Sequence, residues 1–449
     1  MEITIVGAGN VGGFLAEIFS QCHRITVIDS NPFTSKAIYE RFDARVICAN
    51  GCSAETLTNA DIKNCDFFMA MTSDDRSNLL SASIAKALGA GMTICRASDR
   101  TYVDNSQLNY QLHFGIDMFV NPDALCALEF AKEIINPGRV VVENFARGSI
   151  DAQQIKISAD SKFVGKTLQE IRLDPSIRIG CICRDDKYEV ATAKTDMHVG
   201  DIVTIIGTSV AISEISDQLK PQEFPESSSI TVFGGNETAI ALIRYLNDSK
   251  YKIRIIEKNR EICDTLSQQF RNITVIHGDA TSEALMREEQ VNLSDYFIAC
   301  TKDDEENIMT SLQACHIGTK NVMLTLNKGD YEKTLMNITK GLGIKKIIYP
   351  RVATVNELIK YISTEKCVEL SRFPDDSGSF LELKISEKSD YVGKKIHEIP
   401  WPPHCIAVAL SHKFHTKVPC AEDIIDANDQ MIVIVSNEST KDLKKLLLN

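Results

Sequence analysis

The stretch Ile3–Gly12, ITIVGAGNVG, joins a short β-rich run to a glycine turn, and it decides the fold of the first domain. An amphipathic run from Phe14 to Ser20 comes next, and a second β-rich run, Ile25–Ile28, ends at Asp29. Strand, glycine turn, helix and strand form the setting in which a Gly-x-Gly-x-x-Gly motif predicts dinucleotide binding. The sequence therefore predicts a Rossmann-type βαβ unit at this end of the chain.

Each glycine of the motif meets a different steric demand. Gly7 permits the tight turn, Gly9 lets the backbone approach a pyrophosphate, and Gly12 lets the helix pack close to the strand. The N-terminus of the helix then offers free N–H groups and the positive end of a dipole to the phosphates. Asp29 follows about 20 positions later, where a carboxylate can accept hydrogen bonds from both adenosine ribose hydroxyls. A 2′-phosphate there would meet like charge, so we expect NAD(H) rather than NADP(H), with another adenine nucleotide or an empty unit as alternatives.

Length and composition are those of a soluble protein with several domains. The 449 residues suggest about three domains, and the apolar share of 44% and charged share of 24% are ordinary. The net charge of −12 argues against non-specific binding to nucleic acid or anionic lipid, which needs a basic face. We expect no signal peptide, and no apolar run approaches the roughly 18 residues of a membrane-spanning helix. Any role at a membrane would therefore pass through a partner.

The 14 cysteines do not have the spacing of disulfide or zinc sites, and no Cys-x-x-Cys occurs. Most lie in apolar runs, and Cys181 and Cys183 fall on the same side of one expected strand. We expect them to be small buried hydrophobes in a reducing cytosol.

An internal repeat is the most informative pattern in the rest of the chain. Ile3–Gly7 recurs as Ile230–Gly234, and Asp29 recurs as Glu257. The other paired landmarks keep the same offset of about 228 positions: Ala49–Gly51 with Gly278–Ala280, Thr72–Asp75 and Asn78 with Thr301–Asp304 and Asn307, Gly115–Ile116 and Pro122 with Gly343–Ile344 and Pro350, Phe163–Lys166 with Tyr391–Lys394, and Gly200–Asp201 with Asn428–Asp429. Chance would not keep so many landmarks in register, so the chain is a tandem duplication.

Each half divides again. The first part of each half alternates strand and helix patterns, which predicts a parallel, doubly wound sheet. The second part reads as short strands with one helical stretch near Thr167–Ile171, which predicts a small α+β domain. The fold class is therefore α/β, with two Rossmann-like doubly wound parallel sheets, each followed by a small α+β domain. The expected boundaries are 1–136 and 137–220 for the first Rossmann-like and small domains, 221–229 for the linker, and 230–366 and 367–449 for the second pair. Asn136–Gly138 marks the first internal boundary, and Phe373–Ser379 is expected to play the corresponding part in the second half.

These motifs, in this four-domain order, resemble a known family. The chain resembles the peripheral, NAD-binding subunits of Trk potassium-uptake systems, the TrkA family, which carry two regulator-of-potassium-conductance (RCK) modules in tandem. The resemblance covers almost the whole chain and rests on Gly7–Gly12 with Asp29, Thr72–Asp75 before Asn78, Phe163–Leu168 and Gly200–Asp201. It implies a cytoplasmic regulatory ring, peripheral to the membrane through a potassium channel or transporter, that binds NAD(H) and also ATP or ADP to gate potassium uptake. It further implies a homotetramer with eight Rossmann modules, no enzymatic activity, no bound nucleic acid and no direct membrane insertion.

Two nucleotide sites of unequal quality are expected. The cofactor-binding candidates of the first site are Gly7, Ala8, Gly9, Asn10, Val11, Gly12, Asp29, Ser30, Asn50, Gly51, Thr72, Ser73, Asn78, Arg96 and Arg100. Arg96 and Arg100 could neutralise phosphates or be solvated surface arginines, and Thr72 is expected to cap a helix or to touch the ribose. The candidates of the second, weaker site are Gly234, Gly235, Asn236, Glu257, Asp279, Ala280 and Thr301.

Of three substitutions in the second site, two weaken it. Asn236 replaces the middle glycine, where a side chain crowds the pyrophosphate and disfavours positive φ. Ala239 replaces the third glycine, which is tolerated, and Thr325 replaces Arg96. We therefore expect this site to be weak, altered or empty.

Other chemistries find less support. His412-x-x-His415, with His404 and Cys405 nearby, has the ingredients of a metal site, but it reads as a loop-like insertion without counterpart in the first half, and we expect no metal. An NAD-dependent dehydrogenase would need an acid or base after the Rossmann unit, where the small domain offers only His198. A nucleotide sensor for another transporter stays open as an alternative, and nucleotide hydrolysis lacks a Gly-x-x-x-x-Gly-Lys-Ser/Thr motif.

Overall fold

In a computed structural model, the chain forms two compact units, each built from both halves of the sequence. Unit 1 comprises Met1–Ile134 and Glu226–Ile362, and unit 2 comprises Ile135–Pro225 and Ser363–Asn449. The structure describes residues 1–105, 107–135, 142–145, 150–185, 187–208, 211–212, 215, 219, 227–329, 331, 343–362, 367–373, 375–412 and 415–448. The predicted boundary at Asn136–Gly138 and most of the linker 221–229 lie outside these residues, so the domain boundaries stay predictions.

The first half of unit 1 is a six-stranded sheet in which every described pair of neighbours runs parallel. Its strands are β1 (Glu2–Val6), β2 (Arg24–Asp29), β3 (Arg45–Cys48), β4 (Phe67–Ala70), β5 (Met92–Arg96) and β6 (Met118–Val120), in the order β3-β2-β1-β4-β5-β6. The helices are α1 (Asn10–Phe19), α2 (Pro32–Arg41), α3 (Ala54–Asn59), η1 (Ile62–Asn64), α4 (Asp75–Ala87), α5 (Arg100–Val103), α6 (Tyr110–His113) and α7 (Pro122–Ile135). Strand order reverses between β1 and β4, and ligands of such sheets bind at the carboxyl ends of strands at this switch point.

The second half of unit 1 repeats this sheet in the order β14-β13-β12-β15-β16-β17. Its elements are β12 (Ser228–Phe233), α9 (Glu237–Tyr245), β13 (Tyr251–Glu257), α10 (Arg260–Gln269), β14 (Ile273–His277), α11 (Glu283–Glu288), η3 (Val291–Leu293), β15 (Tyr296–Ala299), α12 (Asp304–His316), β16 (Asn321–Thr325), β17 (Ile344–Ile348) and α14 (Pro350–Ile362). The turn glycines after the first strands match as well, with φ of 97° at Gly7 and 102° at Gly234. The two doubly wound parallel sheets and the tandem duplication are therefore confirmed.

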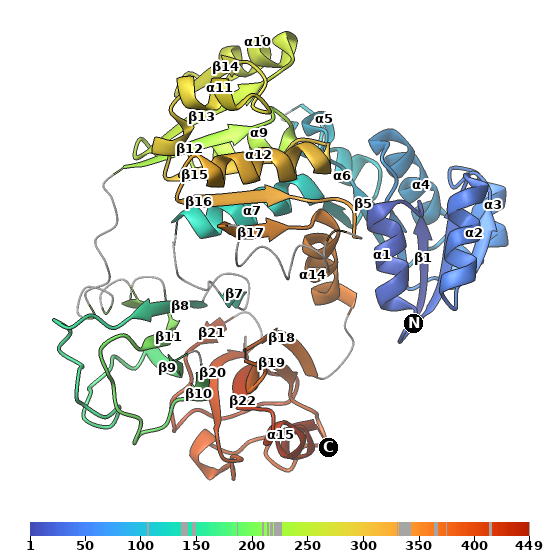
Figure 1. The fold of residues 1–449 in the computed structure, drawn as a ribbon. Helices are drawn as coiled ribbons and strands as arrows, with labels where there is room; N and C mark the ends of the chain where they lie inside the picture. The colour runs from blue at the N-terminus through green and yellow to red at the C-terminus, as the bar shows by residue number, and fades with distance from the viewer. Residues whose placement is uncertain are drawn as a thin grey trace. The chain divides into compact units, whose positions relative to one another are not determined.

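The two sheets of unit 1 exchange their last helices. Phe130 and Ile134 of α7 belong to the buried core around β12 and β13, and Leu358 and Ile362 of α14 belong to the core around β1 and α1. In Figure 1, α7 lies beside the strands of the second sheet and α14 beside the first. Each Rossmann core thus contains a helix from the other half of the chain.

Charged side chains border the exchanged helix α7. Lys346 pairs with Glu129 at 3.0 Å, and Lys345 pairs with Glu133 at 2.8 Å. Burial alone would raise the pKa of Glu129, but Lys346 and Lys132 together hold it below its ordinary value. The carboxylate is therefore ionised at neutral pH and binds α7 to β17.

Unit 2 contains two antiparallel five-stranded sheets. The first has the order β10-β9-β11-β8-β7, with β7 (Val142–Phe145), β8 (Ile150–Lys156), β9 (Ile177–Arg184), β10 (Lys187–Val190) and β11 (Ile202–Gly207). The second has the order β18-β19-β22-β20-β21, with β18 (Cys367–Arg372), β19 (Gly378–Lys384), η4 (Ile396–Glu398), β20 (Cys405–His412), β21 (His415–Lys417), β22 (Gln430–Ser436) and the helix α15 (Thr440–Leu448). Ile206 of the first sheet and Phe380 and Ile434 of the second share one buried core, so the small domains pack on each other.

Three local expectations for the small domains are wrong. Thr167–Ile171 forms a turn rather than a helix, because Thr167 forms a β-bridge with Asp196 and the N–H groups of Leu168 and Gln169 donate to the carbonyl oxygens of Thr195 and Ala193 at 2.9 and 3.0 Å. Phe373–Ser379 spans the hairpin between β18 and β19, both in the second small sheet, so it is no domain boundary. His412 and His415 are paired residues of the β20–β21 hairpin, and the first half has its own hairpin, β9–β10, in the same place.

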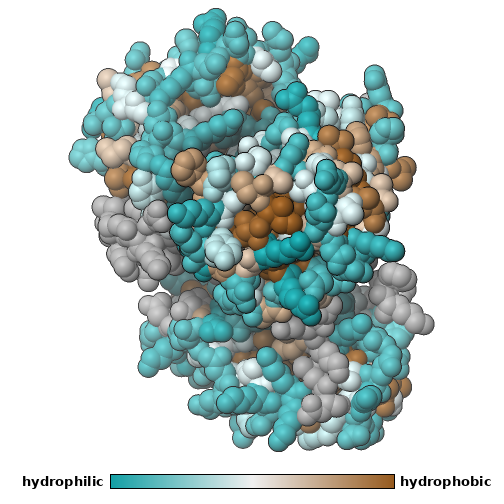
Figure 2. All heavy atoms as spheres, turned by 90° about the vertical axis from the view of Figure 1, so that its right-hand side faces the viewer, coloured by the Kyte–Doolittle hydropathy of each residue, from teal (hydrophilic) through white to brown (hydrophobic). Residues whose placement is uncertain are grey.

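No disulfide joins any of the 14 cysteines, all of which lie in the described residues; Cys181 and Cys183 are buried as expected, and burial raises the pKa of Cys181 to about 12. Figure 2 shows a face on which hydrophilic side chains predominate and apolar ones gather in small groups. Among the helices of the described residues, none is both long and apolar enough to cross a membrane.

The helix exchange makes a stability prediction. Phe130 is fully buried on α7, so Phe130→Ala should lower the free energy of unfolding by about 3–5 kcal/mol, even though this residue belongs to the first half of the chain. Phe33→Ala is the matched control, because Phe33 is 84% exposed on α2 and its loss should change stability by less than about 0.5 kcal/mol. Denaturant unfolding of the full chain measures both values. Equal effects of the two variants would contradict the burial of Phe130 on which the exchange depends.

Candidate functional site

The glycine loop between β1 and α1 divides its steric demands between Gly9 and Gly12. A Cβ on Gly12 would overlap the carbonyl oxygen of Gly7, so the fold itself requires glycine there. A Cβ on Gly9 would meet no atom within 4 Å. Gly9 therefore borders open space at the carboxyl end of β1, where a ligand can approach the protein backbone.

The N-terminus of α1 is open to an anion. Gly9 is its N-cap, no side chain accepts a hydrogen bond there, and the first turn contains no acidic residue. Asn10 is exposed, whereas Ala8 and Val11 are buried, so these two can offer only their backbone to a ligand. Unpaired N–H groups at a helix N-terminus, with the positive end of the dipole, form an anion-binding site.

Asp29, at the end of β2, holds the glycine loop in place. Its Oδ2 accepts the Ala8 N–H at 2.6 Å, and its Oδ1 accepts the Asn31 N–H at 2.8 Å and the Thr34 hydroxyl at 3.0 Å. A carboxylate has about four acceptor positions, so one remains, on Oδ2 beside the loop. The neighbouring Ser30 is exposed. The carboxylate is thus both a structural clamp and a partial acceptor for a ligand hydroxyl.

The turn after β3 is bonded to the backbone of Asp29. The Ala49 N–H donates to the Asp29 carbonyl oxygen at 3.1 Å, and Asn50 Oδ1 accepts the Cys52 N–H at 2.9 Å. Gly51 is buried, and a Cβ there would overlap the side chain of Val6. Asn50 is exposed at the edge of the site, whereas Gly51 serves the packing of the sheet.

The expected capping role of Thr72 is wrong. Asp74 caps α4, because its side chain accepts the Ser77 N–H. The Thr72 hydroxyl bonds Asn78 Oδ1 at 2.7 Å, and Asn78 also donates to the carbonyl oxygens of Thr72 and Arg96, each at 3.0 Å.

Asn78 is buried, and its amide is fully used within the protein. Its oxygen also accepts the Thr72 N–H at 2.9 Å, so both lone pairs and both N–H groups are engaged. Asn78 therefore fixes the ends of β4 and β5 and does not contact a ligand directly. The same set recurs as Thr301, Asp303 and Asn307 in the second half.

The two candidate arginines have different surroundings. Arg96, half-buried at the end of β5, lines a cavity of about 1320 Å³ together with Asn10 and Ser73 of the first half. Arg100 instead pairs with Asp104 at 3.3 Å. The structure therefore brings Arg96, and not Arg100, to the cavity beside the glycine loop.

The same cavity reaches the second glycine loop, where its lining includes Gly234, Gly235, Asn236, Glu257 and Thr301. The sequence placed these residues in a separate site. The structure places parts of both candidate sites around one cavity in unit 1, at the carboxyl ends of strands from both sheets.

Asn236 occupies the anion position of the second loop. Its side chain caps α9 by accepting the Ala239 N–H at 3.1 Å, and its amide nitrogen donates to the Cys300 carbonyl oxygen. The expectation about positive φ is wrong, because φ is −85° at Asn236 and −70° at Gly9, so neither position needs a left-handed backbone. The obstacle is electrostatic and steric instead: the amide oxygen of Asn236 already uses an N–H group that a phosphate would need.

The rest of the second site copies the first with changes in charge. Glu257 Oε2 accepts the Gly235 N–H at 2.6 Å, as Asp29 accepts from Ala8. Lys258 is not among the residues that the sequence predicted for this site. Its ammonium group pairs with Glu306 at 2.5 Å and with Asp279 at 3.4 Å. Ala280 is fully buried and has a packing role.

A further residue that the sequence analysis missed is Asp75. Its Oδ2 accepts the N–H groups of Ser98 and Asp99 at 2.8 and 2.7 Å, which fixes the loop after β5 beside Arg96. Asp304 does the same for Asn327 and Lys328. The acidic pairs that recur at the start of the two helices, Asp74-Asp75 and Asp303-Asp304, were the available signal.

Comparison with known proteins gives matches along both halves. The TrkA-N domain model matches residues 3–122 and 230–350, and the TrkA-C domain model matches residues 152–220 and 380–448. The chain is 26% identical to Trk system potassium uptake protein TrkA homolog 1 of Methanosarcina mazei, over 99% of each chain. It is also 26% identical to Trk system potassium uptake protein TrkA of Vibrio alginolyticus, over 98% of this chain and 96% of that protein.

Solved structures share the fold. The RCK domain of GsuK has a TM-score of 0.63 at 17% identity, covering 99% of this chain and 94% of that one. The GsuK channel bound to NAD has a TM-score of 0.62 at 17% identity, covering 99% and 78%. The arrangement of two Rossmann-like and two small domains is therefore an RCK arrangement.

The different surroundings of Gly9 and Gly12 make a stability prediction. Gly12→Ala should lower the free energy of unfolding by about 3 kcal/mol, the upper end of the range typical of overpacking, because the added methyl meets a backbone oxygen. Gly9→Ala should cost less than about 1 kcal/mol, because its methyl enters open space and only the N-cap preference changes. Thermal and denaturant unfolding without nucleotide measure both. A Gly9→Ala variant as unstable as Gly12→Ala would refute the assignment.

Proposed function

Because the chain belongs to the family defined by TrkA-N and TrkA-C domains, we propose that it is the regulatory subunit of a potassium-uptake system and binds NAD(H) at its first glycine loop. The relatives that this chain matches over nearly their whole length are named potassium uptake proteins. The observation that carries the ligand assignment is the pairing of the open N-terminus of α1 with the Asp29 carboxylate. A dinucleotide has the two groups that such a pair recognises, a pyrophosphate and a ribose diol.

The residues of the first loop fit this ligand. Open space at Gly9 accommodates the pyrophosphate, and the remaining acceptor position on Asp29 Oδ2 can take one ribose hydroxyl. A second ribose bond requires Thr34 to release Oδ1, which is possible because a rotating hydroxyl has its own carbonyl acceptor at Asn31. Arg96 lines the adjoining cavity and can neutralise phosphate charge.

The second loop is proposed to be weaker for NAD(H). Asn236 occupies the helix N-terminus, and Thr325 stands where the first half has Arg96. Lys258 gives this side of the cavity a cation that the first loop lacks at the corresponding Ser30. ATP or ADP is proposed as the ligand here, since a mononucleotide with terminal phosphates gains more from a lysine, and a GsuK structure is described as bound to ADP.

The chain is proposed to act as a cytoplasmic homotetramer held at the membrane by a potassium channel or transporter. A nucleotide can shift a gate only through its differential affinity for two conformations. Moving a gate from 1:99 to 99:1 needs about 5.5 kcal/mol of differential binding. Four first-loop sites contributing about 1.4 kcal/mol each would suffice, which is a tenfold preference per site.

The cavity that extends from Asn10, at the start of α1, to the second glycine loop is the proposed source of that preference. Its lining comes from both Rossmann modules, so a ligand seated on one loop can contact the other module. A change in the spacing of the modules then changes the contacts of the ligand, which is the condition for coupling.

The dehydrogenase alternative loses its support. The family contains potassium uptake proteins, and His198, its only candidate acid or base, bonds Asp196 at 2.8 Å within the first small domain. A sensor for a different transporter remains a matter for the flux experiment below.

Asp29→Ala should weaken NADH binding by about 1.5–3 kcal/mol, the range for hydrogen bonds to a charged group. Glu257→Ala is the matched control, because it removes the equivalent clamp from the second loop and should change NADH affinity much less. Titration calorimetry on the full chain measures both, since α7 and α14 prevent a fair test on separated halves. A larger loss in Glu257→Ala would reverse the site assignment.

Potassium flux tests the function itself. The partner transporter, reconstituted in vesicles with this protein, should change its potassium flux when NADH or ATP is added, and Asp29→Ala should abolish the NADH response. Light scattering on the same preparation should give the mass of four chains. Flux that ignores both the protein and its nucleotides, or a monomer at micromolar concentration, would refute the proposal.

A further inference from the structure

The two small domains of unit 2 contain the same carboxylate with different cations. In the first, the end of β9 places Arg184 against the buried Asp201, with hydrogen bonds of 2.9 and 2.8 Å to its two oxygens. Arg184 also lies 3.6 Å from Asp196. One permanent positive charge thus faces two carboxylates.

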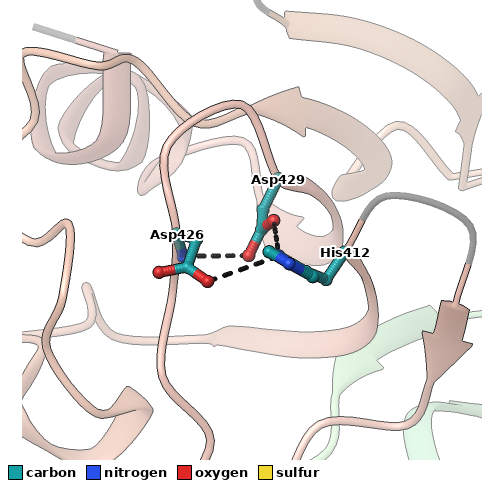
Figure 3. A group of neighbouring side chains, drawn as sticks. All are labelled: His412, Asp426 and Asp429. Carbon is teal, nitrogen blue, oxygen red and sulfur yellow. Dashed lines mark hydrogen bonds and ion pairs between the residues drawn. The ribbon is translucent and has the colours of Figure 1, made fainter.

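In the second small domain, His412 stands at the position of Arg184, at the end of the matching strand β20. Its Nδ1 lies 2.7 Å from Oδ1 of Asp429, the counterpart of Asp201, and 3.4 Å from Oδ2 of Asp426. Figure 3 shows the three side chains pointing toward one another, with the two carboxylates on the turn before β22 and the imidazole on the strand. The Asp426 N–H also donates to Asp429 at 2.9 Å, which fixes the turn.

The second domain has lost the permanent cation but kept the buried carboxylate. The Asp429 side chain is only 3% exposed, and among the described residues neither lysine nor arginine pairs with it or with Asp426. A buried carboxylate is stable only when it is paired or bound to a metal. The duplicated domain shows what this position demands, because there an arginine supplies the charge.

The geometry suits a cation smaller than a guanidinium. Ligand atoms about 2.1 Å from a metal stand about 3.0–3.4 Å apart when the angle between them is near 90–109°. The 3.4 Å from Nδ1 to Asp426 lies in this range, the 2.7 Å to Asp429 is a hydrogen bond that the ion would replace, and all three ligand atoms lie within 4.8 Å of one another. A cation can therefore enter with small rotations of side chains, two of which are partly exposed.

We propose that His412, Asp426 and Asp429 bind one divalent transition-metal ion of the Zn²⁺ or Mn²⁺ class, with water completing the coordination. An imidazole nitrogen disfavours Mg²⁺ and Ca²⁺, which prefer oxygen ligands, whereas one nitrogen and two carboxylates suit first-row ions. The sequence analysis expects no metal at His412-x-x-His415; the proposed site keeps His412 of that pattern and takes its two other ligands from Asp426 and Asp429. The bound ion would tie the end of β20 to the turn before β22.

Zinc binding by the full-length protein tests the site. After removal of metal with a chelator, equilibrium dialysis against ZnCl₂ should find one more tightly bound ion per chain in the wild type than in His412→Arg. This substitution recreates the pair of the first domain, so the metal-free variant should melt no lower than the wild type. Zn²⁺ should raise the melting temperature of the wild type and not that of the variant.

Two further variants separate this site from adventitious binding. Asp426→Asn removes an exposed ligand without emptying the core and should weaken Zn²⁺ binding at least tenfold. His404→Asn removes an exposed neighbouring histidine and should leave the bound ion in place. The proposal is overturned if the wild type and His412→Arg bind the same number of ions with equal affinity, or if His404→Asn alone loses the ion.

Discussion

The exchange of α7 and α14 between the two Rossmann sheets is the contact on which the rest of unit 1 depends. Each helix follows the last strand of its own sheet but buries its apolar face in the core of the other. Polar contacts reinforce the exchange: Thr238 donates to Asp123 at 3.0 Å, and Arg351 stacks over Phe14 at 4.5 Å. Because the exchange fixes the two sheets against each other, the carboxyl ends of strands from both can line a single cavity.

Within that frame, the two acidic residues after the second strands have a role that precedes any ligand. Asp29 and Glu257 each bond an N–H of their own glycine loop and an N–H of the next turn. The loop is thereby preorganised, and the ligand meets a backbone that is already in position. The two sites differ at the N-cap of the following helix. Gly9 leaves the N-terminus of α1 open, whereas Asn236 closes that of α9 with its own amide.

Much of this could be predicted from the sequence, because the decisive signals were local or repeated. The motif at Gly7 defined the turn, and the offset between the halves identified both sheets. The helix exchange could not be predicted, since the apolar face of α7 is the same whichever sheet it covers. The cavity, the buried network of Asn78 and the closure of His412 on Asp429 join residues far apart along the chain. The helix expected near Thr167 failed because the backbone there pairs with a segment further along the chain, through the Thr167–Asp196 bridge and the bond from the Leu168 N–H to Thr195.

Carrying both partners of the helix exchange on one polypeptide has a consequence for assembly. Two separate modules would have to meet in solution, and at low abundance many would remain apart. Covalent linkage turns that meeting into an intramolecular event, whose effective concentration is set by the connecting chain and not by the abundance of the protein. The paired state then no longer depends on how much protein a cell makes. Fusion also frees the two copies from identity, so that one loop can keep Gly9 while the other acquires Asn236, and a symmetric pair becomes two unlike loops.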